Sequence, residues 1–389
     1  MKNKRRIGEI IKLRTGDESY SAYVPKPLPP VPALQMDVLY PLVDEASAAL
    51  GRLDGLSASI PDASLFLYMY ARKEAVLSSQ IEGTQSSLSD LLEFELAGIP
   101  GAPLDDVTEV SNYVAAMNHG IKKLHDGFPL SLRLIREIHE VLLARGRGEK
   151  QSSGEFRRSQ NWIGGTRPGN AAFVPPPPER LMECLDAFEK FLHEKKHRLP
   201  ALVKVALAHV QFESIHPFLD GNGRLGRLLI TLILCAEGVM RSPLLYLSLH
   251  FKTHRKLYYD HLSLVRETGD WEEWISFFLK GVIETANQAA GAAQKITNLF
   301  KVDEKKIKGI GKASGSVIRL HAYLQKQPIS DTGKAVTGTG LTLPTVIRSF
   351  QELEKLEIVR ETSGRERGRM YAYIDYLDLL NQGAEPLKD

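Results

Sequence analysis

Hydrophobic residues recur every three or four positions along most of this chain, which is the spacing of one face of an α-helix. The pattern predicts helices over residues 38–53, 62–81, 86–94, 105–125, 130–145, 179–196, 199–215, 224–238, 252–267 and 271–301. Only short segments are predicted as strands. We therefore expect a mainly α-helical protein.

Two segments rich in proline or glycine interrupt this pattern. Residues 24–33 read VPKPLPPVPA, and we expect an extended arm across the protein core in preference to a ligand for an SH3-like domain. Residues 151–178 form a long insert that ends in four prolines. Within it, residues 162–163 and 172–174 are predicted to pair as a short hairpin. Inserts of this length in a compact helical domain are usually functional lids or else disordered.

The composition changes after the helix that ends near Lys301. Residues 301–316 are rich in Lys and Gly and are predicted as a linker. Beyond them we expect helices over 317–324 and 343–356, and strands over 358–360 and 370–374. The turn between these strands carries Arg365, Arg367 and Arg369. Helices followed by a hairpin with a basic turn are typical of a small winged helix-turn-helix (α+β) domain.

The composition is that of an ordinary globular protein. Hydrophobic residues make up 43% and charged residues 25% of the 389 positions, which excludes collagen-like and disordered chains. A net charge of +3 argues against a wholly basic nucleic-acid coat protein, but not against a local basic patch. Cys184 and Cys235 lie in apolar runs and are expected to be buried thiols. With no apolar stretch long enough for a signal or a membrane span, a cytoplasmic protein without a membrane partner is predicted.

The strongest candidate for chemistry is the segment HPFLDGNGRLGR at residues 216–227. Asp-Gly and Asn-Gly are typical of β-turns, but both flanks have helical periodicity. The segment is therefore predicted as a glycine-rich loop that leads into the N-terminus of a helix. Such a loop binds anions, because converging backbone N–H groups and the helix dipole favour phosphate.

Four side chains of this segment indicate nucleotide chemistry. Arg224 and Arg227 lie three residues apart on one helix face, where both can reach a polyphosphate. Asp220 is a hard oxygen ligand suited to Mg²⁺. His216 titrates near neutrality when unperturbed and can act as a general base. Together they indicate phosphoryl or nucleotidyl transfer.

These twelve residues resemble the Fic family motif, His-x-Phe-x-Asp/Glu-Gly-Asn-Gly-Arg-x-x-Arg, at every specified position. The resemblance implies a Fic helical-bundle core that transfers AMP from ATP to a Ser, Thr or Tyr hydroxyl of a target protein and releases pyrophosphate. It also implies a role for each matched residue: general base for His216, Mg²⁺ ligand for Asp220, anion hole for Gly221, Asn222 and Gly223, phosphate contact for Arg224, γ-phosphate contact for Arg227, and a place in the ATP-binding segment for Leu225 and Gly226.

A second resemblance lies upstream. The segment SSQIEG at residues 78–83 is similar to the family's inhibitory pattern, Ser/Thr-x-x-x-Glu-Gly/Asn, although alone it would fit an ordinary helix end. It implies that Glu82, at the end of the helix that carries Ser78, pairs with Arg227 and keeps that arginine from the γ-phosphate. Because the segment precedes the core, the chain resembles the class with an N-terminal inhibitory helix.

Two further assignments follow from the family resemblance. Residues 162–178 take the place of the family's flap, in which Phe173 and Val174 would align the target by main-chain pairing. Tyr258 and Tyr259 are similar to the aromatic pair near the adenine pocket. One of two adjacent aromatic residues on a helix is normally in the core, so only one is expected at the pocket, with Tyr259 favoured.

The predicted organisation is an N-terminal arm and helix at 1–60, an inhibitory-helix region at 61–125, the Fic core at 126–300, the linker at 301–316 and the winged helix at 317–380. The alternative function is a DNA-binding regulator that acts through the winged helix. The same site could also serve removal of AMP or another nucleotide donor. Self-AMPylation and a homodimer are further expectations from the family.

Overall fold

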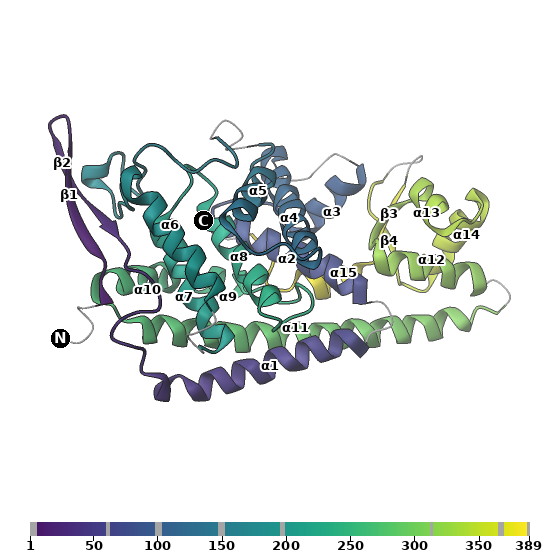
Figure 1. The fold of residues 1–389 in the computed structure, drawn as a ribbon. Helices are drawn as coiled ribbons and strands as arrows, with labels where there is room; N and C mark the ends of the chain where they lie inside the picture. The colour runs from purple at the N-terminus through teal and green to yellow at the C-terminus, as the bar shows by residue number, and fades with distance from the viewer. Residues whose placement is uncertain are drawn as a thin grey trace.

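The computed structural model describes residues 6–59, 63–97, 103–146, 152–194, 199–311, 314–364 and 369–386. Within these ranges the protein is mainly α-helical, as predicted, with two small antiparallel sheets. Figure 1 shows an elongated helical bundle with a β-hairpin at one end and a small C-terminal unit at the other. No helix in the described ranges combines the length and apolar character that a membrane span requires.

The first described element is a β-hairpin that the hydrophobic pattern did not predict. Strands β1 (Glu9–Thr15) and β2 (Glu18–Val24) pair in antiparallel register, with Gly16 in a left-handed conformation at the turn. Half of its strand residues are exposed, so no continuous apolar face marks it in the sequence. Only the end of β2, residues 22–24, is buried.

The central bundle contains the predicted helices. They are α1 (Tyr40–Ser59), α2 (Ala63–Ile81), α3 (Leu88–Ala97), α4 (Leu104–His125), α5 (Leu132–Leu142), α6 (Pro178–His193), α7 (Ala201–Ile215), α8 (Asn222–Ala236), α9 (Ser248–Thr253), α10 (Arg255–Thr268) and α11 (Trp271–Lys308), with 3₁₀ turns η2 (Met36–Val38) and η3 (Pro168–Asn170). α7 is buried from Leu202 to Ile215, so it forms the centre of the bundle, and α8 packs beside it. The proline-rich arm after β2 has no helix or strand, and its Lys26 carbonyl accepts a hydrogen bond from Gln211 of α7 (3.0 Å).

Two of the differences from the predicted helix boundaries change the architecture of the chain. The single helix expected over 252–267 is broken at His254 (φ −111°, ψ 38°), which separates α9 from α10. α11 continues past Lys301 to Lys308, so residues 301–308 of the predicted linker are helical. Tertiary contacts explain this extension, because Ile307 is fully buried and Asp303 accepts a 2.5 Å hydrogen bond from the Tyr373 hydroxyl.

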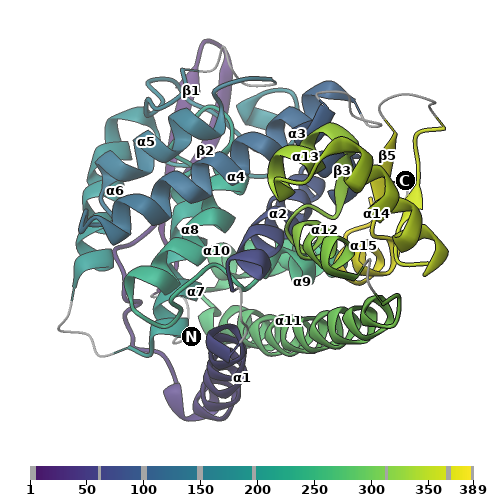
Figure 2. The same ribbon diagram turned by 90° about the vertical axis from the view of Figure 1, so that its right-hand side faces the viewer.

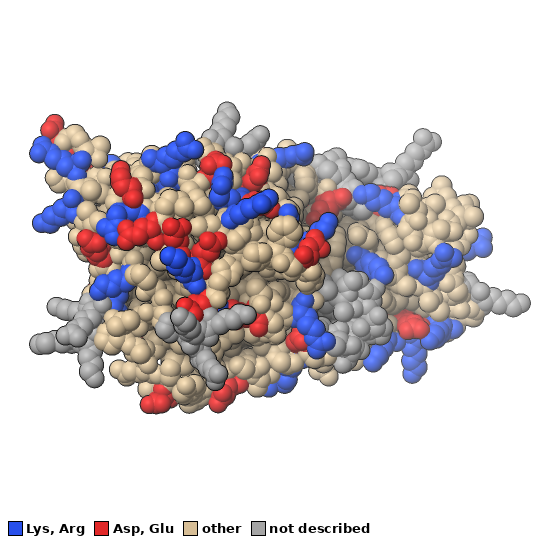
Figure 3. All heavy atoms as spheres, viewed as in Figure 1, with Lys and Arg blue, Asp and Glu red and all other residues tan. Residues whose placement is uncertain are grey.

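The C-terminal unit comprises residues 314–386. Its elements are α12 (Ser314–Lys326), β3 (Ile329–Asp331), α13 (Thr332–Thr339), α14 (Leu343–Lys355), β4 (Arg360–Glu361), β5 (Met370–Ala372) and α15 (Ile374–Asn381), and the sheet order is β3-β5-β4. The winged-helix assignment stays a prediction, since Arg365 and Arg367 of the basic turn lie outside the described residues. On the face in Figure 3, Lys and Arg side chains gather over this unit with few acidic ones between them.

The C-terminal unit packs back onto the central bundle. α15 contacts α2, α3 and α11. Figure 2 shows α15 beside α12 at the end of the bundle, with α2 running behind the C-terminal unit. The helix that carries the predicted inhibitory residues therefore contacts a segment about 300 residues later in the chain.

Candidate active site

The glycine-rich loop lies between α7 and α8, as predicted. α7 ends at Ile215, and His216 takes a left-handed backbone conformation (φ 49°), which is uncommon for a residue other than glycine. Gly221 (φ 74°) takes the same conformation directly before α8 begins at Asn222. These two reversals bring His216 and the N-terminus of α8 to the wall of one pocket.

Two side chains hold the backbone of this loop in shape. The Asn222 amide accepts a hydrogen bond from the Phe218 N–H (2.9 Å) and donates one to the Phe218 carbonyl (2.8 Å). Arg157, a buried residue of the insert, donates from Nε to the His216 carbonyl (2.9 Å). The loop is therefore fixed from within and from the insert before any ligand binds.

His139 of α5 supports the second half of the loop. Its Nδ1 accepts the Gly154 N–H (2.9 Å), so its Nε2 carries the proton and donates to the Asp220 carbonyl (3.0 Å). The ring stacks on Phe218 with 3.7 Å between centroids. Burial lowers the pKa of His139 to about 4, although the Asp220 carbonyl opposes this shift. The ring is thus neutral at pH 7 and keeps both hydrogen bonds.

The loop forms one wall of a pocket of about 470 Å³, a volume suited to a small-molecule ligand. The lining residues come from the turn after α2, from α4, α7, α8 and α10, from the insert and from the loop: Glu82, Glu109, Trp162, Ile163, Gly164, Glu213, His216, Leu219, Asp220, Gly221, Asn222, Gly223, Arg224, Arg227, Tyr258 and Tyr259. The predicted base, metal ligand, arginines and anion loop therefore meet at one site.

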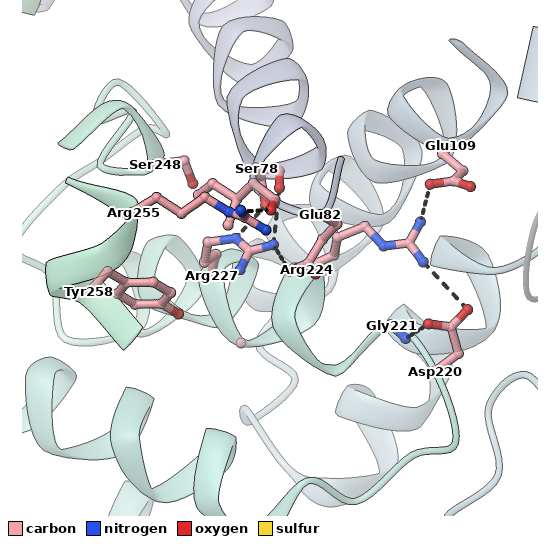
Figure 4. Close-up of polar contacts among 12 residues, drawn as sticks. Ser78, Glu82, Glu109, Asp220, Gly221, Arg224, Arg227, Ser248, Arg255 and Tyr258 are labelled. Carbon is pink, nitrogen blue, oxygen red and sulfur yellow. Dashed lines mark hydrogen bonds and ion pairs between the residues drawn. The ribbon is translucent and has the colours of Figure 1, made fainter. Parts of the chain in front are cut away.

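Arg224 lies between two carboxylates on the wall of this pocket (Figure 4). Its Nη1 donates to Glu109 Oε2 (3.0 Å), and its Nη2 lies 3.8 Å from Asp220 Oδ2. The Asp220 side chain is 44% exposed, and its Oδ1 accepts the Gly221 N–H (2.6 Å). A carboxylate that faces the pocket beside an anion-binding loop fits the oxygen-donor preference of Mg²⁺, so Asp220 is the residue that would hold this ion.

Another group of potential metal ligands lies outside the pocket. His250, His254 and Glu284 each place one ligand atom within 4.8 Å of the others. His250 Nδ1 and Glu284 Oε2 are 2.8 Å apart. An ordinary hydrogen-bonded pair already accounts for this proximity.

Arg227 contacts Ser78 of α2 and Glu82 just beyond its end (Figure 4). Its Nε donates to Ser78 Oγ (2.9 Å), and its Nη2 donates to the Ser78 carbonyl (3.0 Å) and to Glu82 Oε1 (2.6 Å). The side chain of Arg227 is 1% exposed. The two residues that the resemblance pairs, Glu82 and Arg227, thus lie in direct contact.

The Glu82 carboxylate also occupies the space above the loop. A β-carbon added to Gly223 would lie 2.4 Å from Glu82 Oε1, so the carboxylate rests directly on this glycine. Burial raises the pKa of Glu82, but the positive charge of Arg227 outweighs burial and holds the pKa below its ordinary value. Glu82 is therefore ionised at neutral pH, where its negative charge opposes the entry of a phosphate.

His216 is neutral in this environment. Burial, together with the positive charges of Arg266 and Arg157, lowers its pKa to about 3. Its Nδ1 has no hydrogen-bond partner among the described residues. A neutral imidazole with an uncommitted ring nitrogen can accept a proton, but a pKa of about 3 makes it a weak base, so the role of base stays a prediction.

Two family models match this chain. The Fic/DOC family N-terminal model covers residues 40–122, and the Fic/DOC family model covers residues 129–234. The chain therefore contains a Fic/DOC N-terminal region and a Fic/DOC domain. The second model includes all twelve motif residues, 216–227, and the first includes Ser78 and Glu82.

Known Fic proteins resemble this chain in sequence and fold. It is 35% identical over 234 residues to the protein adenylyltransferase Fic of Aedes aegypti, and 31% identical over 240 residues to that of Culex quinquefasciatus. These alignments cover 58% and 60% of this chain but 43% and 44% of the relatives, so the chain spans less than half of their length. The crystal structure of a Fic family protein from Desulfovibrio desulfuricans superposes with a TM-score of 0.53 at 20% identity, covering 86% of this chain and 96% of that chain.

The two adjacent tyrosines of the Fic core both line the pocket, so the expectation of only one there was wrong, but they differ in exposure. Tyr258 is 1% exposed, and its hydroxyl donates to His209 Nε2 (2.9 Å). His209 Nδ1 in turn donates to the Gly226 carbonyl (3.1 Å), which links Tyr258 to α8. Tyr259 is 39% exposed, with the Arg255 guanidinium 5.6 Å from its ring centroid. Tyr259 therefore presents the more accessible ring for a nucleotide base.

The segment in the place of the Fic flap has little free main chain at the predicted residues. Ile163 and Phe173 exchange hydrogen bonds of 2.8 and 3.1 Å, as the predicted hairpin requires. The Val174 carbonyl accepts the Tyr23 N–H of β2 (2.9 Å). The Arg266 guanidinium lies 3.9 Å from the Phe173 ring centroid. Pairing of a target with Phe173 or Val174 stays a prediction.

Arg157, His139 and Glu109 contact the Fic loop but were not identified from the sequence. Each comes from an element distant from the motif, so no local spacing connects it with the loop. His139 carries a weak signal, because it occupies the buried face of α5 together with Ile135 and Ile138. A histidine at an otherwise apolar helical position is the feature that could have indicated it.

Proposed function

We propose that this protein transfers AMP from ATP to a hydroxyl side chain of a target protein, and that Glu82 keeps the enzyme inactive. The observation that carries the proposal is the convergence of His216, Asp220, Arg224 and Arg227 around one anion-binding loop. The names of the curated relatives, which are protein adenylyltransferases, support the same activity.

In the proposed reaction, the target hydroxyl oxygen attacks the α-phosphorus of ATP. A bond forms between these two atoms, the bond from the α-phosphorus to the oxygen bridging to the β-phosphorus breaks, and pyrophosphate leaves. The hydroxyl proton passes to His216. Backbone N–H groups of Asn222 and Gly223 at the N-terminus of α8 would stabilise the negative charge on the phosphates, and the Gly221 N–H would join them if it leaves the Asp220 carboxylate.

The bound phosphates would also make His216 a better base. Their negative charge opposes the effect of Arg266 and Arg157 on the pKa of His216, so the pKa rises toward its ordinary value when ATP binds. Mg²⁺ at Asp220 would supply further neutralisation of the phosphate charge.

Inhibition by Glu82 would act through two contacts. Glu82 holds the Arg227 guanidinium at 2.6 Å, which removes this cation from a γ-phosphate. It also occupies the space over Gly223, where the phosphates would meet the loop. Removal of the Glu82 carboxylate would relieve both.

The test uses ATP labelled at the α-phosphate, with Mg²⁺, with and without cell lysate. Protein labelling is expected to rise in Glu82→Gly and to disappear when His216→Ala is added. Glu183→Gly removes an exposed glutamate that pairs with Arg180 and does not line the pocket, so this variant serves as the matched control and should label like the wild type. Labelling that persists without His216 would refute the mechanism, and absence of label from every variant would refute ATP as the donor.

A further inference from the structure

Residues 382–385 follow α15 and lie against the helix that leads to the inhibitory glutamate. We call these four residues the docking segment. Their backbone carbonyls accept hydrogen bonds from three long side chains: Lys73 of α2 donates to Gln382 (2.7 Å), Gln80 of α2 donates to Ala384 (2.9 Å), and Lys252 of α9 donates to Gly383 (3.2 Å) and to Glu385. Every carbonyl of the docking segment is therefore bound by a side chain of the Fic bundle.

The three donors are buried, which distinguishes this arrangement from a surface contact. Lys73, Gln80 and Lys252 are 2%, 1% and 7% exposed. A buried ammonium group is costly unless acceptors surround it, and here the main-chain carbonyls are acceptors. Burial lowers the pKa of Lys73 to about 8, against the opposing effect of the Glu385 carboxylate. Without the docking segment, two lysines in the bundle would lose hydrogen-bond acceptors.

The shape of the site also matches the docking segment. Gly383 has a positive φ of 80°, and a β-carbon there would lie 2.8 Å from Leu249 Cδ1 of α9. Ala384 is 1% exposed. Upstream, the buried residues Tyr376, Leu377 and Leu380 anchor α15. The site therefore requires glycine at position 383 and a small side chain at position 384.

Gln80 connects the docking segment with the inhibitory turn. Its Nε2 donates to the Ser86 carbonyl (2.9 Å) as well as to Ala384, so one side chain bridges the segment after α2 and the docking segment. Glu82 lies between Gln80 and Ser86, and Ser78 lies one helical turn before it. Without the docking segment, Gln80 and Lys73 would each lose a hydrogen-bond acceptor. Both lie on the helix that positions Ser78 and Glu82 against Arg227.

We propose that Lys73, Gln80 and Lys252 form an intramolecular binding site for an extended peptide backbone, recognised through its carbonyl oxygens. The docking segment occupies this site and holds the end of α2 in place. Undocking loosens α2, releases Glu82 from Arg227 and activates the enzyme. The last step rests on the proposed function, whereas docking and its effect on α2 do not.

The test combines hydrogen exchange with the labelling assay on the full chain. Gly383→Val forces a side chain against Leu249, and Lys73→Met removes one donor without changing the docking segment. Gly364→Val is the matched control, because Gly364 also has a positive φ (62°) but an added β-carbon there meets no atom within 4 Å. Amide exchange in α7 and α8 reports whether each variant keeps its folded core.

In both test variants we expect exchange of amides 78–86 to rise about tenfold or more, because a buried hydrogen bond to a charged donor is lost. Exchange in α7 and α8 should stay at the wild-type level, Gly364→Val should match the wild type throughout, and labelling should rise with exchange. Unchanged exchange of amides 78–86 in both variants would overturn the proposal. If exchange of amides 78–86 rises but labelling stays at the wild-type level, in an assay where Glu82→Gly is active, then undocking does not activate the enzyme and the regulatory step is overturned. If even Glu82→Gly fails to label, the proposed function fails and exchange alone decides the docking.

Discussion

The ion pair between Glu82 and Arg227 leads to a prediction in which stability and activity change in opposite directions. Glu82→Gln keeps the size of the side chain but removes its negative charge. Arg227 then retains its two hydrogen bonds to Ser78 and loses a charge-assisted contact of 2.6 Å. A residue with a purely structural role would lower stability and activity together.

The magnitude follows from the burial of the two partners. A hydrogen bond to a charged group contributes about 1.5–3 kcal/mol, and the Arg227 side chain is 1% exposed. The Glu82 side chain is 38% exposed, so water screens part of the interaction and the lower end of the range applies. We expect Glu82→Gln to lower the free energy of unfolding by about 1–2 kcal/mol.

The assay is urea-induced unfolding of the wild type, Glu82→Gln, Arg227→Gln and the double variant. The coupling energy of this cycle should be about 1–2 kcal/mol. Protein labelling from α-labelled ATP should meanwhile rise in Glu82→Gln, because the space over Gly223 no longer holds an anion. A coupling energy below about 0.3 kcal/mol, or labelling that falls in Glu82→Gln, would refute this account of the pair.

Three further predictions concern residues around the loop. Asn222→Ala removes both hydrogen bonds to the Phe218 backbone and should cost about 2–3 kcal/mol in urea unfolding; a loss below about 0.5 kcal/mol would contradict the loop-closing role. His139→Phe keeps the stack on Phe218 but loses the bond to the Asp220 carbonyl, so in the Glu82→Gly background labelling should fall about tenfold, and unchanged labelling would contradict its positioning role. Burial raises the pKa of Glu213 to about 7, against the opposing charge of Arg227. The protonated Glu213 side chain therefore contributes to the stability of the folded protein. This contribution is fully present below the ordinary pKa of 4.5 and is lost as the pH rises through 7. We therefore measure the free energy of unfolding of Glu213→Gln minus that of the wild type. This difference should be up to about 3 kcal/mol larger at pH 8 than at pH 4, and a difference independent of pH would contradict this assignment.

The sequence alone determined the helices of the bundle and the placement of the reactive loop. Helices such as α5 and α7 were predictable because apolar spacing and breaking residues are local properties of the chain. The loop at 216–227 was predictable for the same reason, since its glycines and flanking periodicity place it before a helix N-terminus. Glu82 and Arg227 were linked only through the resemblance to a family motif.

The tertiary structure decided what surrounds the loop. Arg157 and His139 reach the loop from separate elements, so local spacing could not connect them with it. The extension of α11 to Lys308 depends on Tyr373, and the hairpin of β1 and β2 has too few buried positions to form a pattern. The burial of Lys73 against Gln382 joins residues 309 positions apart. Such contacts depend on how the helices pack in three dimensions, whereas the periodicity of a sequence reports only which face of each helix is apolar.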